Sequence, residues 1–114
     1  MKDEVKAVTI ELENGTKYTL DYDRETAETA EENGLDISTI KSRPIGTVRK
    51  LFHYAFLKNH PKVTKQQTDD MIDEYFGGVA KFPPKLIERL ALLYMQTVET
   101  LNDEKNLKKA TITY

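Results

Sequence analysis

Few side chains in this chain of 114 residues have types and spacing that suit chemistry. The only two histidines, His53 and His60, stand seven positions apart, and there is no cysteine. A zinc site needs further histidine, cysteine or carboxylate ligands, and no acid lies close to this pair in the sequence. We therefore expect no metal site and no cysteine nucleophile. Both histidines are predicted to be partly exposed side chains on a helix.

A run of acids, Asp69, Asp70, Asp73 and Glu74, is the second candidate for chemistry. Two carboxylates four positions apart on a helix suit a divalent cation, but acids near a helix N-terminus are also stabilised by the helix dipole. We favour the second interpretation. The serines and threonines have no histidine and acid at a recognisable spacing, so nucleophilic catalysis has no support. The prediction is a protein without enzymatic activity and without a cofactor.

Charge is distributed unevenly along the chain. Residues 1–43 carry eleven acids and six bases, whereas residues 44–114 carry eight acids and eleven bases. The segment between Asp36 and Asp69 contains no acid at all. Either this segment forms a basic face for an acidic partner, protein or nucleic acid, or it is a solvated face beside the acidic N-terminal third. The net charge of −2 argues against bulk attraction to nucleic acid. The bases of this acid-free segment are Lys41, Arg43, Arg49, Lys50, Lys58, Lys62 and Lys65.

An aromatic helix within the acid-free segment supplies the candidate partner-binding residues. Tyr54 lies off the main apolar stripe of this helix, beside Lys50 and Lys58. A tyrosine among bases can stack on a nucleotide or anchor a protein partner, and it can equally cap the edge of a core. The predicted partner-binding residues are Arg49, Lys50, Tyr54, Phe56, Leu57 and Lys58.

The N-terminal part is predicted to be a β-hairpin over residues 4–22. Apolar residues alternate with polar ones on both sides of Glu13-Asn14-Gly15, which is the strand pattern around a turn. A two-residue turn would put the two apolar sets on opposite faces. A three-residue loop places Ile10 opposite Tyr18 and all large apolar side chains on one face, with Gly15 in the left-handed conformation. We therefore predict the three-residue loop.

Helices follow the hairpin. A short acidic helix over residues 23–34 has Asp23 as N-cap and Gly34 as its stop. The clearest apolar stripe predicts a helix over 45–59 and consists of Ile45, Val48, Leu51, Phe52, Ala55 and Phe56. Thr64 and Gln67 form a capping box for a helix over 65–76, and Pro83-Pro84 opens the last helix, about 85 to 102.

The expected fold is α+β, an N-terminal hairpin packed against a small bundle of three to four helices. Residues 1–102 form one domain, and the polar tail 103–114 either adds a short strand through Thr111–Tyr114 or stays disordered. No apolar stretch approaches the roughly 20 residues that span a bilayer. The N-terminus, Met1-Lys2-Asp3-Glu4-Val5, lacks the charged-then-apolar layout of a secretory signal.

The order of these features resembles that of the small tail-assembly chaperones of long-tailed bacteriophages and prophages of Gram-positive bacteria. The resemblance covers roughly residues 5–102 and rests on layout and short strings. These are the hairpin Val8–Tyr22, the segment Glu32-Asn33-Gly34-Leu35-Asp36-Ile37, the string Lys41-Ser42-Arg43-Pro44 and the aromatic segment Leu51–Pro61, which ends in His60-Pro61.

The resemblance implies a non-enzymatic protein that binds the tape-measure protein and keeps it soluble until the tail tube polymerises around it. Such a chaperone acts in the cytoplasm of the bacterial host and is absent from the mature virion. It associates weakly with itself and binds neither nucleic acid nor membrane. The alternative is a small phage or prophage regulator that binds nucleic acid, which the acid-free segment favours and the acidic N-terminal third opposes.

Overall fold

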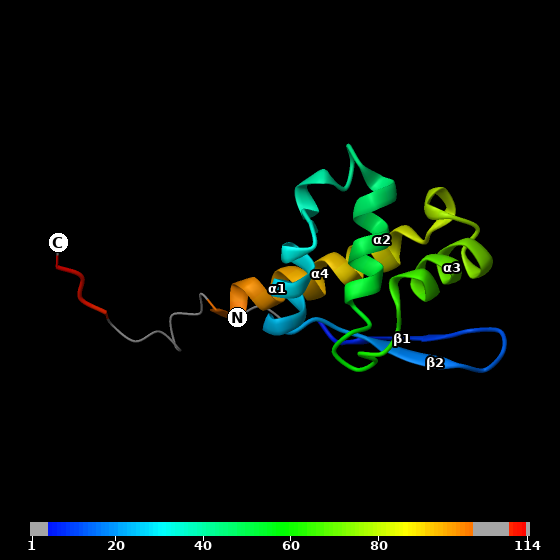
Figure 1. The fold of residues 1–114 in the computed structure, drawn as a ribbon, viewed down its shortest axis with the longest axis horizontal. Helices are drawn as coiled ribbons and strands as arrows, with labels where there is room; N and C mark the ends of the chain where they lie inside the picture. The colour runs from blue at the N-terminus through cyan, green and yellow to red at the C-terminus, as the bar shows by residue number, and fades with distance from the viewer. Residues whose placement is uncertain (1–4, 102–109, 114) are drawn as a thin grey trace.

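The computed structural model describes residues 5–101 and 110–113 of the chain. A hairpin of β1 (Val8–Glu11) and β2 (Lys17–Leu20) opens the fold, and helices follow it (Figure 1). The fold is α+β, as the sequence predicts. The helical elements are α1 (Arg24–Glu32), the 3-10 turn η1 (Ile37–Thr39), α2 (Pro44–Tyr54), α3 (Lys65–Tyr75), the 3-10 turn η2 (Val79–Lys81) and α4 (Pro84–Leu101).

The hairpin has the register that its apolar pattern predicts. Val8 pairs with Leu20 and Ile10 pairs with Tyr18 in an antiparallel ladder. The Leu12 N–H donates to the Thr16 carbonyl at 2.8 Å, which closes the three-residue loop. Gly15 takes φ +90°, a left-handed conformation that a side chain would strain. The three-residue loop is therefore confirmed, and one face of the ribbon is apolar.

Side-chain caps fix the N-termini of α1 and α3. Asp23 accepts a hydrogen bond from the Thr26 N–H, and Thr64 accepts one from the Gln67 N–H. In each case the third helical residue returns a bond to the cap backbone, which satisfies two otherwise orphaned donors. Gly34 follows α1 with φ +93°. These boundaries confirm the predicted start of both helices and the stop of α1.

Helix α2 ends earlier than the apolar stripe predicts. The expected range was 45–59, but the helix runs from Pro44 to Tyr54, and residues 55–59 form successive turns. The Ala55 carbonyl accepts the Asp21 N–H of the hairpin at 2.9 Å instead of continuing the helical ladder. Pro61 also disfavours helical backbone at the residue before it. The prediction of a helix to residue 59 was therefore wrong: the Phe56 N–H already bonds the His53 carbonyl, three residues back, and the Ala55 carbonyl just beyond the helix is engaged by the hairpin.

The core lies where α2 meets every other layer. In Figure 1, α2 crosses α4, and the hairpin runs along one side of the helices. Phe52 is fully buried, and its ring packs edge-on against Phe56, Phe76 and Phe82 at centroid distances of 4.9, 6.0 and 5.2 Å. Leu20 and Tyr22 bring the hairpin into the same core, and the Tyr22 hydroxyl donates to the Leu51 carbonyl at 2.7 Å.

The C-terminal tail is described only over residues 110–113. These four residues form no strand, and Ile112 is 71% exposed. The predicted alternatives for the rest of the tail fall on residues 102–109 and 114, which lie outside the described residues. The buried apolar residues of the described chain lie between Leu12 and Tyr94, inside the predicted domain 1–102. In the same part of the chain, no helix has the length and hydropathy that a membrane span requires.

Candidate partner-binding surface

Arg49, a predicted partner-binding residue, is held by α3. Its guanidinium lies 2.8 Å from an Asp73 carboxylate oxygen and 3.6 Å from one of Asp69, and it donates to the Asp69 carbonyl at 3.3 Å. The hydrogen bond to Asp73 raises the pKa of Arg49 despite partial desolvation. Only 21% of the Arg49 side chain is exposed. Arg49 therefore joins α2 to α3 and offers little free charge to a partner.

The segment after α2 is tied to the hairpin in the same way. The Lys58 ammonium lies 2.7 Å from a carboxylate oxygen of Asp21, and this hydrogen bond raises the pKa of Lys58. The Asn59 amide donates to the Thr19 carbonyl at 3.3 Å, and His60 Nε2 accepts the Thr19 N–H at 2.9 Å. The outer edge of β2 is therefore covered by residues 55–60.

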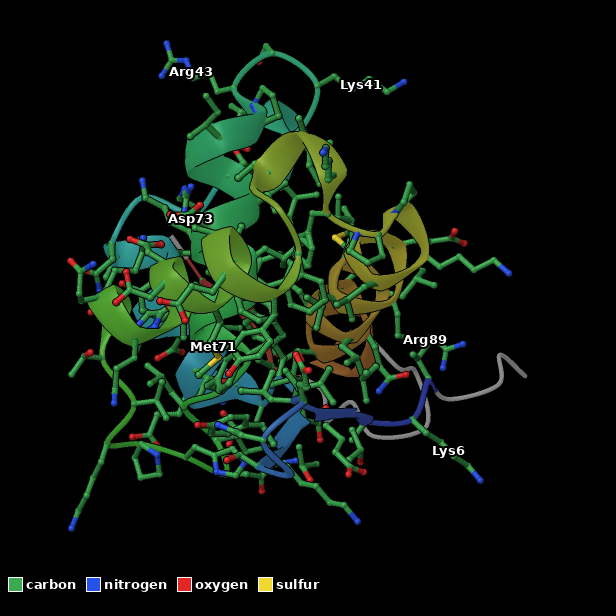
Figure 2. The ribbon with its side chains drawn as sticks, turned by 90° about the vertical axis from the view of Figure 1, so that its right-hand side faces the viewer. Lys6, Lys41, Arg43, Met71, Asp73 and Arg89 are labelled. Atoms are coloured by element: carbon green, nitrogen blue, oxygen red, sulfur yellow. The ribbon has the colours of Figure 1, made fainter. Side chains whose placement is uncertain are left out.

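Lys50 points to a third element. Its ammonium nitrogen lies beside Gly34, and a Cβ atom added to this glycine would be only 2.9 Å from that nitrogen. The charge of Lys50 therefore lies at the C-terminal end of α1. A cation at this end interacts favourably with the helix dipole. Lys41 and Arg43 instead extend outward from the loop before α2 (Figure 2). Arg49, Lys50 and Lys58 therefore contact three different elements, whereas Lys41 and Arg43 point outward, so these five bases do not share one face, the first of the two alternatives considered from the sequence.

Phe56 cannot contact a partner in this fold. It is fully buried, and its ring packs against Phe52 and against Tyr18, whose centroid is 5.1 Å away. Phe56 belongs to the apolar stripe that faces the core, so its side chain offers no exposed surface to a partner. Tyr54 and Leu57 are half-buried. Desolvation raises the pKa of Tyr54, and its ring lies edge-on to His53, so it packs on the edge of the core.

The two histidines differ from the prediction of partly exposed helix residues. His53 is on α2 but is buried, with Nδ1 3.1 Å from the Thr68 hydroxyl of α3. Burial, and to a lesser degree the charge of Lys65, lowers the pKa of His53, while Asp69 opposes the shift. His60 lies in the loop after α2 and not on a helix. Both histidines join elements, and among the residues that the structure describes neither belongs to a group of side chains that could hold a metal ion.

The acids of α3 serve as ion-pair and hydrogen-bond partners. The Asp69 carboxylate accepts from Lys65 at 2.7 Å and lies 3.6 Å from the Arg49 guanidinium, and Asp70 accepts from the Gln66 amide at 2.9 Å. Within the described chain, no three histidine, cysteine or carboxylate side chains come close enough to hold a metal ion. The first turn of α3 contains no acid, so the helix dipole does not explain these residues, contrary to the interpretation favoured from the sequence.

Exposed apolar side chains are the feature that the sequence analysis missed. Leu92 and Met95 lie one turn apart on α4 and are 44% and 41% exposed. Tyr75 at the end of α3 and Ile45 at the start of α2 are also exposed. The sequence contained a signal for this exposed surface, since Leu92 and Met95 lie off the buried stripe of α4 that contains Leu90 and Leu93. Apolar residues outside a stripe that already faces the core are candidates for contact with a partner.

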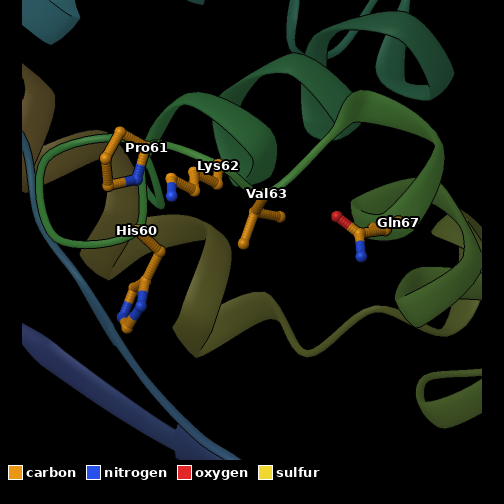
Figure 3. Close-up of a pocket in the computed structure, with 5 residues that line it drawn as sticks. All are labelled: His60, Pro61, Lys62, Val63 and Gln67. Carbon is orange, nitrogen blue, oxygen red and sulfur yellow. The ribbon is translucent and has the colours of Figure 1, made fainter.

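The surface also has two open hollows. The first, of about 410 Å³, lies at the start of α3 and is lined by His60, Pro61, Lys62, Val63 and Gln67 (Figure 3). In Figure 3 the His60 ring points toward the strands of the hairpin, consistent with its bond to Thr19. The second, which we call the hairpin groove, has about 450 Å³ and lies between the hairpin and the end of α3. It is lined by Ile10, Glu11, Leu12, Glu13, Tyr75 and Phe76.

A family described as "Domain of unknown function (DUF5055)" matches residues 1–114 of the chain. The chain belongs to the DUF5055 family. No curated protein and no solved structure matches it. The features of this DUF5055 domain that suit a partner are therefore those of its own surface: the apolar pair on α4, the two hollows and the outward bases Lys41 and Arg43.

Proposed function

We propose that the protein is a non-enzymatic chaperone of phage tail assembly that binds the tape-measure protein and keeps it soluble before the tail tube polymerises. It acts in the cytoplasm of the bacterial host and leaves before the virion is complete. The resemblance over residues 5–102 suggests this role. The structural observation that supports it is the apolar surface of α4, where Leu92 and Met95 are both more than one-third exposed.

A surface of this kind suits an amphipathic helical client. Helix-in-groove binding uses apolar anchors spaced by one helical turn, and flexible methionine adapts to varied client side chains. Leu92 and Met95 have this spacing, and the half-buried Ala91 lies beside them. Two exposed anchors give modest affinity. Modest affinity suits a chaperone that tube subunits must displace.

The residues proposed from the sequence contribute unequally to such a surface. Lys50, Tyr54 and Leu57 remain candidates because each is partly exposed. Arg49 and Lys58 are engaged in ion pairs with Asp73 and Asp21, so charge reversal at either would disturb the fold before it tested binding. Client binding is therefore better tested on α4.

The experiment is co-expression of the protein with the tape-measure protein from the same locus, with the client scored for solubility and co-purification. The chain with Leu92→Asp and Met95→Asp should lose the client while its circular dichroism and thermal midpoint stay close to those of the parent chain. Ile45→Asp is the control, because Ile45 is exposed to an even larger degree, 66%, but lies on α2. Insoluble client with the parent chain, or equal loss with the control, contradicts the proposal.

A nucleic-acid-binding regulator is the second candidate, and the exposed Lys41 and Arg43 favour it. Phosphate contacts make affinity fall steeply with salt. The test is titration with duplex DNA at low and moderate salt, with Lys41→Ala and Arg43→Ala as the variant. Salt-sensitive binding that this variant loses would support the regulator, and absence of binding would remove it.

A further inference from the structure

β1 has an open backbone edge. The N–H groups of Thr19 in β2 and of Asp21 just after it point away from β1, because they donate to His60 Nε2 and the Ala55 carbonyl. Since β1 and β2 pair in register, the backbone groups of Thr9 and Glu11 must point away from β2. No hydrogen bond within the described residues uses them. An unpaired edge of this kind accepts a further strand.

The hairpin groove lies beside this edge and restricts what can bind there. Ile10 and Leu12 form its apolar wall on the hairpin side, and Tyr75 and Phe76 form the opposite wall. Glu11 and Glu13 are exposed at its rim. A matching occupant is an extended segment with an apolar side chain at alternate positions and a lysine that meets these glutamates.

One segment of this chain has that pattern. Residues 109–113 read Lys-Ala-Thr-Ile-Thr, with β-branched residues at three successive positions and a lysine at the start. Ile112 is 71% exposed and has no apolar cover within the described residues. We propose that residues 109–113 of a second copy of the chain add antiparallel to the open edge of β1 and place Ile112 in the hairpin groove.

The pattern selects a single register. If Ile112 lies opposite Ile10, then Thr111 lies opposite Glu11 and exchanges backbone hydrogen bonds with it, since Glu11 offers its N–H and carbonyl on that side. Lys109 then lies opposite Glu13. A slip by one residue would move Ile112 to the solvent face and separate the two charges.

The chain's own copy of this segment is too short to make these contacts. Gln96 of α4 bonds the Val5 backbone, and from there α4 and β1 run in opposite directions (Figure 1). Leu101 is five residues beyond Gln96, about 7.5 Å of helix, and Glu13 is eight residues beyond Val5, about 26 Å of strand. Because the two elements diverge, these two lengths add up to the separation between Leu101 and Glu13, which the linking segment would have to span. The eight residues from Leu101 to Lys109 span at most about 29 Å. A second copy is therefore the occupant, and two copies exchange segments around a two-fold axis.

The test is sedimentation velocity of the full chain over a concentration series. We expect a reversible monomer–dimer equilibrium, and Ile112→Asp should raise its dissociation constant at least about tenfold, because the groove loses an apolar side chain and gains a charge. Thr113→Asp is the matched control: it adds the same charge one position away, on the solvent side of the proposed strand, and should leave the dimer almost unchanged. Both positions lie outside the core, so both variants should fold.

Charge exchange tests the register. Glu13→Lys should weaken the dimer, and combining it with Lys109→Glu should restore it. A monomeric parent chain at all concentrations would overturn the proposal. So would a dimer that Ile112→Asp and Thr113→Asp weaken equally, or one that the charge exchange fails to rescue.

Discussion

His53 is a titratable side chain that folding removes from water. It donates to or accepts from the Thr68 hydroxyl at 3.1 Å, faces Lys65 and Asp69 of α3, and lies edge-on to Tyr54. Burial lowers its pKa below the ordinary value of about 6.5, so the unfolded chain binds the proton more tightly than the folded chain. Where the unfolded state binds more protons, stability increases with pH.

The free energy of unfolding should therefore fall as pH is lowered from about 7 toward about 5, with His53 as one cause. His53→Gln keeps a hydrogen-bonding group for Thr68 but removes the titration, so its unfolding free energy should depend less on pH across this window. Urea unfolding at several pH values measures this. An identical pH dependence in the parent chain and the variant would contradict it.

Phe56 and Ile45 belong to the same predicted apolar stripe but have opposite environments. Phe56 is fully buried against Phe52 and Tyr18, whereas Ile45 is 66% exposed. Phe56→Ala should destabilise the chain by about 3–5 kcal/mol, because it loses the transfer energy of the ring and leaves a cavity. Ile45→Ala should change stability by no more than about 0.5 kcal/mol. Chemical denaturation of both variants checks the contrast, and Phe56→Leu gives a measurable intermediate if Phe56→Ala does not fold.

These residues show what a stripe in the sequence can and cannot predict. Its period indicated correctly that Val48, Leu51 and Phe52 face the core. It also placed Phe56 toward the core, where this residue is fully buried, but it could not indicate that Ile45, the first residue of the stripe, is 66% exposed. Whether a residue of the stripe is buried depends on which other elements pack against its turn of the helix. The residues close to it in the sequence do not determine this.

At the scale of elements, the contact between the hairpin and residues 55–60 connects the two halves of the fold. His60 Nε2 accepts the Thr19 N–H at 2.9 Å, and the His60 ring lies edge-on to Tyr18 at 5.1 Å. This bond requires an unprotonated Nε2, because a protonated nitrogen has no lone pair to accept with. The donor, the Thr19 N–H, is partly buried, so without this bond it would be only partly solvated.

His60→Phe should keep the ring contact with Tyr18 and remove the acceptor. We expect a loss of about 1–2 kcal/mol, since a partly buried donor is left without a partner. Hydrogen exchange at the Thr19 amide should become faster than in the parent chain. Asn59→Ala, which removes an exposed and longer bond to the same residue, should have a smaller effect. Unchanged exchange at Thr19 in His60→Phe would mean that the bond does not protect the strand.

Elements whose determinants are close in sequence were predicted well. The register of the hairpin followed from alternation and one glycine, and the starts of α1 and α3 followed from capping residues three positions from their partners. The end of α2 was missed because the Ala55 carbonyl is taken by Asp21, more than thirty positions earlier. The ion pairs of the candidate binding residues were not predicted for the same reason, since Arg49 meets Asp73 and Lys58 meets Asp21.

At the scale of the whole molecule, the described core and the C-terminal segment are separate. The buried residues end at Tyr94, whereas the proposed exchange of residues 109–113 adds contacts only between copies. Anything that binds the folded chain more tightly than the unfolded chain raises its apparent stability by mass action. The full chain and a chain that ends after residue 102 should therefore differ only in how their apparent stability depends on protein concentration.

At low protein concentration the two chains should have nearly the same thermal midpoint, because changes at the surface alter the free energy of unfolding by no more than about 0.5 kcal/mol. As concentration increases, the midpoint of the full chain should rise, while that of the shortened chain should stay constant, because only the full chain can form the exchanged dimer. Calorimetry over a concentration series checks both statements. A shortened chain that is less stable even when dilute would show that residues beyond 102 belong to the domain. Parallel behaviour at all concentrations would show that they contribute to neither the domain nor the dimer.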